Sequence, residues 1–169
     1  FDFYMGEEFA RNKLVLFEKP DTGYAYVSVT WPGMTGVLSG MNTEGLTVTI
    51  NASKLETPSM SATPISILTK EILQYASDID EAVRIAASRQ TFVSESILIG
   101  SAKDGRAAII EKTPSQMAVY DPASGDPDIH HIICTNHYQS TTFRDNPVNQ
   151  DNIRMSDSMW RFRRVEQLL

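Results

Sequence analysis

Residues 24–31 alternate strictly between two kinds of side chain, and this alternation restricts the fold more than any other feature. Ala25, Val27, Val29 and Trp31 fall on one face of an extended chain, with tyrosine, serine and threonine residues on the other. A period of two predicts a β-strand that is covered on one face. The chain must therefore supply partner strands to complete a sheet.

Further strands are predicted on both sides of a helical stretch. Turn residues at 20–23, 32–33 and 42–45 divide the region 13–51 into successive antiparallel hairpins. Strand patterns then resume near residue 96. The predicted strands are residues 14–17, 24–31, 35–39, 46–51, 96–100, 107–111, 116–120 and 131–135.

Three segments have a helical period. An apolar stripe after Thr63-Pro64 predicts a helix that begins with Pro at its first position and extends to Ala76. Asp78 and Glu81 form a capping-box pattern that opens a second helix ending near residue 89. A third helix is predicted over 151–169. The order of sheet, helix pair, sheet and helix predicts one α+β domain over residues 1–169, with two antiparallel sheets and the helices outside them.

Composition narrows the classes of partner. The formal net charge of the 169 residues is -6, which argues against a nucleic-acid partner because phosphate binding requires a basic face. The basic cluster 161–164 is interpreted as a solvated helix face. No apolar run approaches the roughly 20 residues that a membrane span needs. The single cysteine excludes an internal disulfide and leaves the cellular compartment undecided.

Both ends have the character of cut ends. The chain starts at Phe1 without an initiator Met or signal-peptide pattern, and the last helical pattern reaches Leu169 without a stop residue. We therefore expect a piece of a longer polypeptide, with any targeting segment outside it.

Cys134 is the obvious candidate for a nucleophile, with His130, His131 and His137 nearby in the sequence. In the predicted strand 131–135, Cys134 shares a face with His130, whereas His131 and His137 point to the other face. A Cys-His pair is therefore disfavoured. A metal site shared by His131 and His137 is disfavoured too, because about 3.3 Å per residue would place them roughly 20 Å apart. A buried structural cysteine is the preferred interpretation.

Three polar residues remain as candidates: Asp2, Asn51 and Asn136. Asn51 closes one predicted strand and Asn136 follows another, which turn formation explains. A side-chain amide at the rim of a sheet can also donate to a developing oxyanion. The residues alone leave both interpretations open. The chain has no Gly-rich phosphate loop or metal-binding motif, so no cofactor or metal is expected.

Three segments resemble the acyl-coenzyme A:6-aminopenicillanic acid acyltransferase family, which is related to the choloylglycine hydrolases among N-terminal-nucleophile (Ntn) enzymes. They are residues 1–3 (FDF), 31–51 (WPGMTGVLSGMNTEGLTVTIN) and 134–138 (CTNHY). The resemblance follows nearly the whole chain in order. It implies a four-layer αββα sandwich of two antiparallel sheets, incomplete at both ends here.

The resemblance also implies a mechanism. A precursor cleaves itself to expose an N-terminal cysteine, whose thiol attacks an amide carbonyl while its α-amino group acts as base. Asp2 matches the acid that orients the nucleophile, Asn51 matches an oxyanion-hole residue, and Asn136 matches the site asparagine of the Thr-Asn-His segment. The implied partners are a small-molecule N-acyl amide substrate and the remaining N- and C-terminal parts of the same precursor.

The nucleophilic cysteine and an arginine of the family pattern are expected just upstream of Phe1 and are absent from this sequence. Cys134 cannot replace that cysteine, because it has no free α-amino group. The chain by itself is therefore expected to be inactive. The alternative is a non-catalytic binding or structural domain that kept the Ntn fold, and a thiol enzyme based on Cys134 is a third.

Overall fold

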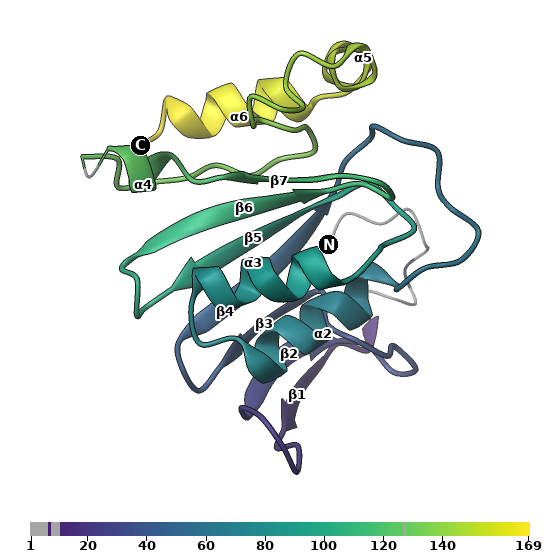
Figure 1. Cartoon of the computed structure of the whole chain (residues 1–169), viewed down its shortest axis with the longest axis vertical. Helices are drawn as coiled ribbons and strands as arrows, with labels where there is room; N and C mark the ends of the chain where they lie inside the picture. Colours follow the sequence, from purple (N-terminus) through teal and green to yellow (C-terminus); the bar gives the residue numbers. More distant parts are fainter. Residues whose placement is uncertain (1–6, 8–10, 127) are drawn as a thin grey trace.

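The computed structural model describes residues 7, 11–126 and 128–169, and its strands form a seven-stranded antiparallel sheet (Figure 1). The strands lie in chain order, so each pairs with the next along the sequence. They are β1 (Leu14–Glu18), β2 (Tyr26–Thr30), β3 (Ser39–Asn42), β4 (Leu46–Ala52), β5 (Glu95–Ser101), β6 (Arg106–Lys112) and β7 (Met117–Tyr120).

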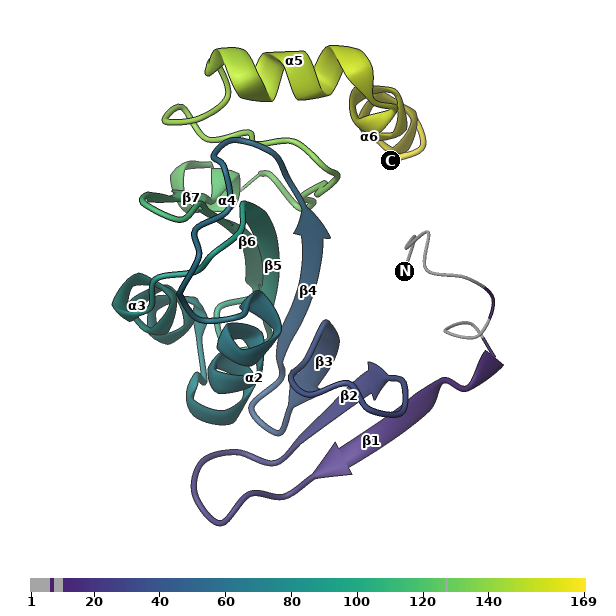
Figure 2. The same ribbon diagram turned by 90° about the vertical axis from the view of Figure 1, so that its right-hand side faces the viewer.

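The four longer helices fall into two groups. Helices α2 and α3 connect β4 to β5 and cover one face of the sheet, whereas α5 and α6 lie past β7, away from β1 (Figure 2). The bounds are α2 (Ile65–Tyr75), α3 (Ile79–Ser88), α4 (Pro122–Gly125), α5 (Pro147–Met155) and α6 (Ser158–Glu166). Within the described ranges, no helix has the length and apolar character needed to cross a bilayer.

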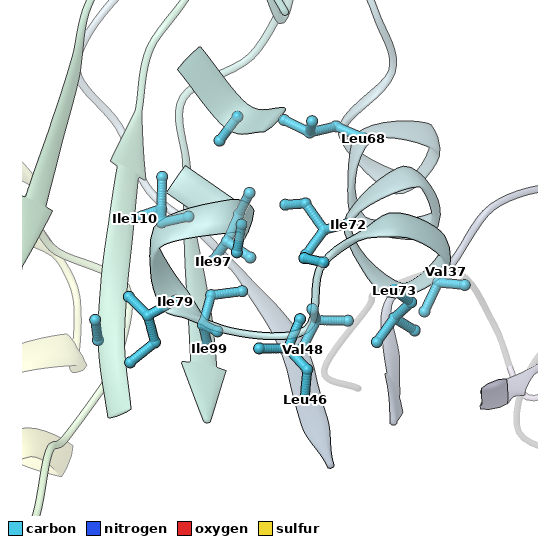
Figure 3. Close-up of a cluster of buried hydrophobic side chains, with 14 of the residues drawn as sticks. Val37, Leu46, Val48, Leu68, Ile72, Leu73, Ile79, Ile97, Ile99 and Ile110 are labelled. Carbon is cyan, nitrogen blue, oxygen red and sulfur yellow. The ribbon is translucent and has the colours of Figure 1, made fainter. Parts of the chain in front are cut away.

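The main core lies between α2, α3 and the sheet. Leu68, Ile72 and Leu73 form the buried stripe of α2 and face buried side chains of the central strands, among them Val48 and Ile97 (Figure 3). This face-to-face burial fixes the side of the sheet on which each strand residue lies. One half of the predicted capping box is confirmed, because the carboxylate of Asp78 accepts a hydrogen bond from the backbone N–H of Glu81 at 2.9 Å. The Glu81 carboxylate accepts instead from the backbone N–H of Ser77, one residue before the cap, at 2.8 Å.

Asn42 joins this core to the turn between β3 and β4. Its buried amide donates to the carbonyl oxygens of Leu73 and Ala76 at 2.9 and 2.7 Å, and its Oδ1 accepts from the backbone N–H groups of Glu44 and Leu46, each at 3.0 Å. One side chain therefore ties the end of α2 to the hairpin that leads into β4.

The opposite face of the sheet is open over β1 to β3. The register pairs Val15 with Val29 and Phe17 with Val27, and Val27 with Met41, so these residues share the face turned away from α2. Phe17 is 80% exposed and Val15 is 60% exposed. Exposed apolar patches of this kind are unusual on a sheet face that remains in contact with solvent.

The expectation of two sheets is not met within residues 11–126 and 128–169. The strands before and after the helix pair belong to one sheet, because β5 pairs with β4 over seven residue pairs, from Leu46 with Ser101 to Ala52 with Glu95. Local periodicity identifies strands but not their partners. The return of the chain beside β4 is decided by how α2 and α3 pack.

Three local predictions also need correction. Residues 131–135 form no strand, and the strand predicted over 35–39 lies at Ser39–Asn42. The helix predicted over 151–169 is divided into α5 and α6 by Ser156, whose backbone is extended (φ -127°, ψ 170°). Short polar side chains such as those of Ser156 and Asp157 compete for backbone hydrogen bonds and weaken a helix interior.

Candidate active site at the end of β4

Asn51 lies near the end of β4, on the sheet face opposite α2 and α3. Val48 belongs to the core face, and the alternation of a strand places Asn51 on the other side. The Asn51 amide donates to the Sγ atom of Cys134 at 3.2 Å. The segment around Cys134 therefore crosses this face of the sheet where β4 ends.

Asn136 is held at the same end of β4 by its side chain and its backbone. Its Nδ2 donates to the carbonyl oxygen of Ala52 at 2.8 Å, and its Oδ1 accepts from Arg161 Nη2 at 2.7 Å. Its backbone N–H donates to Ser158 Oγ at 2.8 Å, and its carbonyl accepts from Asn152 Nδ2 at 2.6 Å. The structure thus brings Asn136 beside the residue that follows Asn51.

The segment that contains Asn136 is fixed by buried side chains. Asn149 is fully buried and pairs with both the N–H and the carbonyl of Tyr138, at 2.9 and 3.1 Å. The buried carboxylate of Glu111 accepts from the backbone N–H groups of Gln139 and Ser140, and burial raises its pKa. The backbone N–H and C=O groups of this segment are therefore hydrogen-bonded to side chains. In a β-strand the same groups would be hydrogen-bonded to a neighbouring strand.

Cys134 occupies a position that suppresses thiolate formation. Burial raises the pKa of the Cys134 thiol to about 11, against the opposing effect of the hydrogen bond from Asn51. The thiolate is the nucleophilic form of cysteine, so the raised pKa disfavours Cys134 as a nucleophile at neutral pH. The strand geometry used to disfavour Cys134 was wrong, because residues 131–135 are not a strand, but the chemistry of the thiol gives the same result.

His137 is separated from His130 and His131 in the structure. His137 is buried, with Nδ1 2.8 Å from Ser158 Oγ and its ring 5.5 Å from that of Phe162. Burial and the charge of Arg161 lower its pKa. His130 and His131 are exposed at a pocket of about 550 Å³. This pocket lies beside Arg106, the first residue of β6. The described residues contain no group of three or more His, Cys, Asp or Glu side chains placed to hold a metal.

Asp2 lies outside the described residues, so the predicted trio is represented by Asn51 and Asn136. Sequence reasoning missed Ser158 and Arg161. Both contact Asn136 and are three positions apart in α6, which places them on one helix face. The sequence pattern assigns Arg161 to the solvated basic cluster 161–164, but its guanidinium contacts Asn136. Spacing from Ser158 was a signal that distinguishes it from its neighbours.

A pocket of about 490 Å³ opens beside Ala52. Residues 53–58 form one wall of it, and Val93, Glu95 and Val148 contribute to the others. The Oε2 atom of Glu95 is buried without a hydrogen-bond partner among the described residues. Burial raises the pKa of Glu95 to about 7.

Glu95 is expected to make the protein less stable as the pH rises from about 4.5 to about 7. In this window the unfolded chain has released the Glu95 proton and the folded protein still holds it, so the free energy of unfolding falls by about 3 kcal/mol in total. Glu95→Gln should remove this fall. Urea unfolding of the full-length protein at several pH values measures the difference between wild type and variant.

Glu56 provides a control of opposite sign. The pKa of the Glu56 carboxyl is lowered overall. Burial alone would raise this pKa, but the hydrogen bonds from Thr113, Ser115 and Gln116 have the larger effect. Glu56→Gln should therefore remove stability that is present at neutral pH and lost in acid. If Glu95→Gln left the pH dependence of wild type unchanged, Glu95 would not be the group responsible.

Residues 5–169 match the family model described as acyl-coenzyme A:6-aminopenicillanic acid acyl-transferase. The chain belongs to this family. The acyl-transferase family match includes both asparagines of the candidate site, and it confirms the resemblance identified in the sequence.

Solved structures agree with this family assignment at the level of the fold. A Caenorhabditis elegans ortholog of N-acylethanolamine-hydrolyzing acid amidase has a TM-score of 0.64 at 19% identity, over 94% of this chain and 71% of that chain. A single-residue variant of conjugated bile acid hydrolase from Clostridium perfringens has a TM-score of 0.54 at 16% identity, over 78% of this chain and 48% of that chain.

A curated relative covers a smaller region. An uncharacterized protein of Archaeoglobus fulgidus is 27% identical in an alignment of 118 residues that covers 67% of this chain. The matched region spans 20% of that relative's length.

Proposed function

We propose that the protein containing this chain cleaves or transfers acyl groups at non-peptide C–N amide bonds of small N-acyl compounds. The observation that carries this proposal is the convergence of two side-chain amides at one end of β4. The side chain of Asn136 donates a hydrogen bond to the carbonyl of Ala52, which follows Asn51 in the sequence. The side chain of Asn51 donates to Cys134, which lies two residues before Asn136. Membership in the acyl-transferase family supports an enzyme of this class.

The Asn136 amide suits the stabilisation of an oxyanion. An amide nitrogen carries two hydrogens, and in the part of the chain that the structure describes one of them donates to Ala52. The second can donate to a substrate oxygen. Asn51 is proposed as a further member of the oxyanion site, and Asp2 as the acid that orients the nucleophile.

The proposed nucleophile is an N-terminal cysteine, exposed by self-cleavage upstream of Phe1. Its thiol adds to the amide carbonyl and its α-amino group takes the thiol proton, for which a pKa of about 7.7 is suitable. The C–N bond then breaks, the leaving amine takes that proton, and a thioester remains. Attack by water gives hydrolysis, and attack by an amine gives acyl transfer. The chain without this cysteine is proposed to be inactive.

The open face of β1 to β3 supports the proposed four-layer arrangement. Val15, Phe17, Val29 and Met41 expose apolar surface on the face opposite α2 and α3. In a complete αββα sandwich a second sheet covers this face. We propose that the remaining N- and C-terminal parts of the same precursor supply it.

The upstream coding sequence and mass spectrometry test the proposed function. The upstream sequence should contain a cysteine, followed by Arg-Asn just before Phe1. Full-length protein treated with N-acyl substrates or a thiol-directed probe should carry the adduct on the new N-terminal cysteine. Another residue in place of that cysteine, or an adduct on Cys134, would contradict the proposal.

Cys134→Ser is expected to leave the activity of the full-length protein nearly unchanged. The serine hydroxyl keeps an acceptor for the Asn51 amide, so kcat/KM should change by less than about threefold, below about 1 kcal/mol. Steady-state kinetics on an N-acyl substrate checks this. Loss of turnover in a folded Cys134→Ser protein would favour the thiol enzyme based on Cys134.

A further inference from the structure

Arg161 contacts Asn136 from the first turns of α6. Its Nη2 atom donates to Asn136 Oδ1 at 2.7 Å and to Asp157 Oδ1 at 2.8 Å, and its side chain is 40% exposed. Ser158, one turn earlier in α6, accepts the backbone N–H of Asn136. The same helix thus holds the backbone of Asn136 with one residue and the side-chain amide with another.

The two partners of the Asn136 amide determine its orientation. A guanidinium group can only donate hydrogen bonds, and the carbonyl of Ala52 can only accept them. With Oδ1 on Arg161 and Nδ2 on Ala52, the plane of the amide is fixed and its second N–H has a single direction. A hydrogen bond to a charged donor also polarises the amide, which makes its N–H a stronger donor.

The position of α6 is itself fixed close to Arg161. The buried Ser158 hydroxyl lies 3.0 Å from Thr135 Oγ1 and 2.8 Å from His137 Nδ1. The ring of Phe162 packs against His137. These contacts join α6 to the residues on both sides of Asn136, so the guanidinium of Arg161 is presented to Asn136 by a packed helix.

We propose that Arg161 is a positioning residue that orients and polarises the Asn136 amide for donation to the oxyanion of the reaction. The inference rests on the proposed function, since it assigns Asn136 that role. Arg161 acts through Asn136. Its loss should therefore slow the chemical step and leave substrate binding almost unaffected.

Kinetics of the full-length protein tests the role of Arg161. Arg161→Ala should lower kcat by about 10-fold to 100-fold, as expected for the loss of one charged hydrogen bond, with KM within about twofold. Added guanidinium ion should restore part of kcat, and Arg161→Lys should retain more activity than Arg161→Ala. Arg164→Ala, which removes an exposed arginine of the same helix, should match wild type.

A double-mutant cycle separates positioning from a structural effect. If Arg161 acts through Asn136, Arg161→Ala should cause no further loss of kcat in an Asn136→Ala background. The side-chain amide resonances of Asn136 in a ¹⁵N–¹H NMR spectrum should shift in Arg161→Ala, independently of turnover. Additive losses, or unchanged Asn136 resonances, would overturn the inference.

The outcome also distinguishes this inference from the proposed function. A wild-type protein that forms no acyl-enzyme would overturn the proposed function and the role of Arg161 with it. An active wild type that loses activity in Asn136→Ala, but keeps its full kcat in Arg161→Ala, would overturn the positioning role alone.

Discussion

Replacing Asn136 with alanine is expected to lower kcat of the full-length protein by about 10²-fold to 10³-fold, with KM almost unchanged. The reason is that an oxyanion exists in the transition state and not in the bound substrate. A donor aimed at it therefore contributes to the chemical step. Steady-state kinetics together with the rate of acyl-enzyme formation, followed by mass spectrometry, measures the effect.

Asn136→Asp provides the matched control for the alanine variant. It keeps an oxygen for Arg161 Nη2 and removes the N–H that donates to Ala52 and to the substrate. We expect it to be at least as impaired as the alanine variant. Wild-type kcat in a folded Asn136→Ala protein would remove Asn136 from the proposed mechanism.

Asn42→Ala is expected to lower the free energy of unfolding by about 4 kcal/mol, since the buried amide makes four hydrogen bonds of about 1 kcal/mol each. The backbone groups left behind include the carbonyls of Leu73 and Ala76 at the end of α2. Urea unfolding should show a lower midpoint at a nearly constant slope.

Thr43→Ala is the control for Asn42→Ala, since Thr43 is an exposed side chain in the same turn. It should change stability by less than about 0.5 kcal/mol. If both substitutions lowered the free energy of unfolding by the same amount, the turn itself would be sensitive to substitution. The hydrogen bonds of Asn42 to α2 would then not explain the loss of stability in Asn42→Ala.

Local sequence patterns predicted the fold correctly where neighbouring residues decide the structure. The alternation in 24–31 and the turn at 42–45 predict the first hairpins, and the stripe of Leu68, Ile72 and Leu73 predicts α2 with its buried face. Asn42 was assigned to turn chemistry. Its bonds to Glu44 and Leu46 fit that prediction, whereas its bonds to α2 join residues more than 30 positions apart and have no local signal.

Predictions failed where side chains from distant segments decide the structure. The apolar residues of 131–135 have the composition of a strand, but the backbone that follows is satisfied by Asn149 and Glu111. No local pattern indicates such partners. The spacing of Ser158 and Arg161 places both on one face of α6, but it does not indicate what that face contacts, which depends on where α6 docks. The catalytic roles of Asn51 and Asn136 stay predictions until the variants are measured.

The order of the strands has a consequence for how the protein folds during synthesis. Each strand pairs with the one made before it, and the helix pair interrupts this succession once, between β4 and β5. Short-range pairing of this kind lets a sheet grow strand by strand from the N-terminal side. Asn51 can therefore take its place as soon as β4 has formed. Asn136 can take its place only later, because its contacts to Ser158 and Arg161 can form only after the ribosome has released α6.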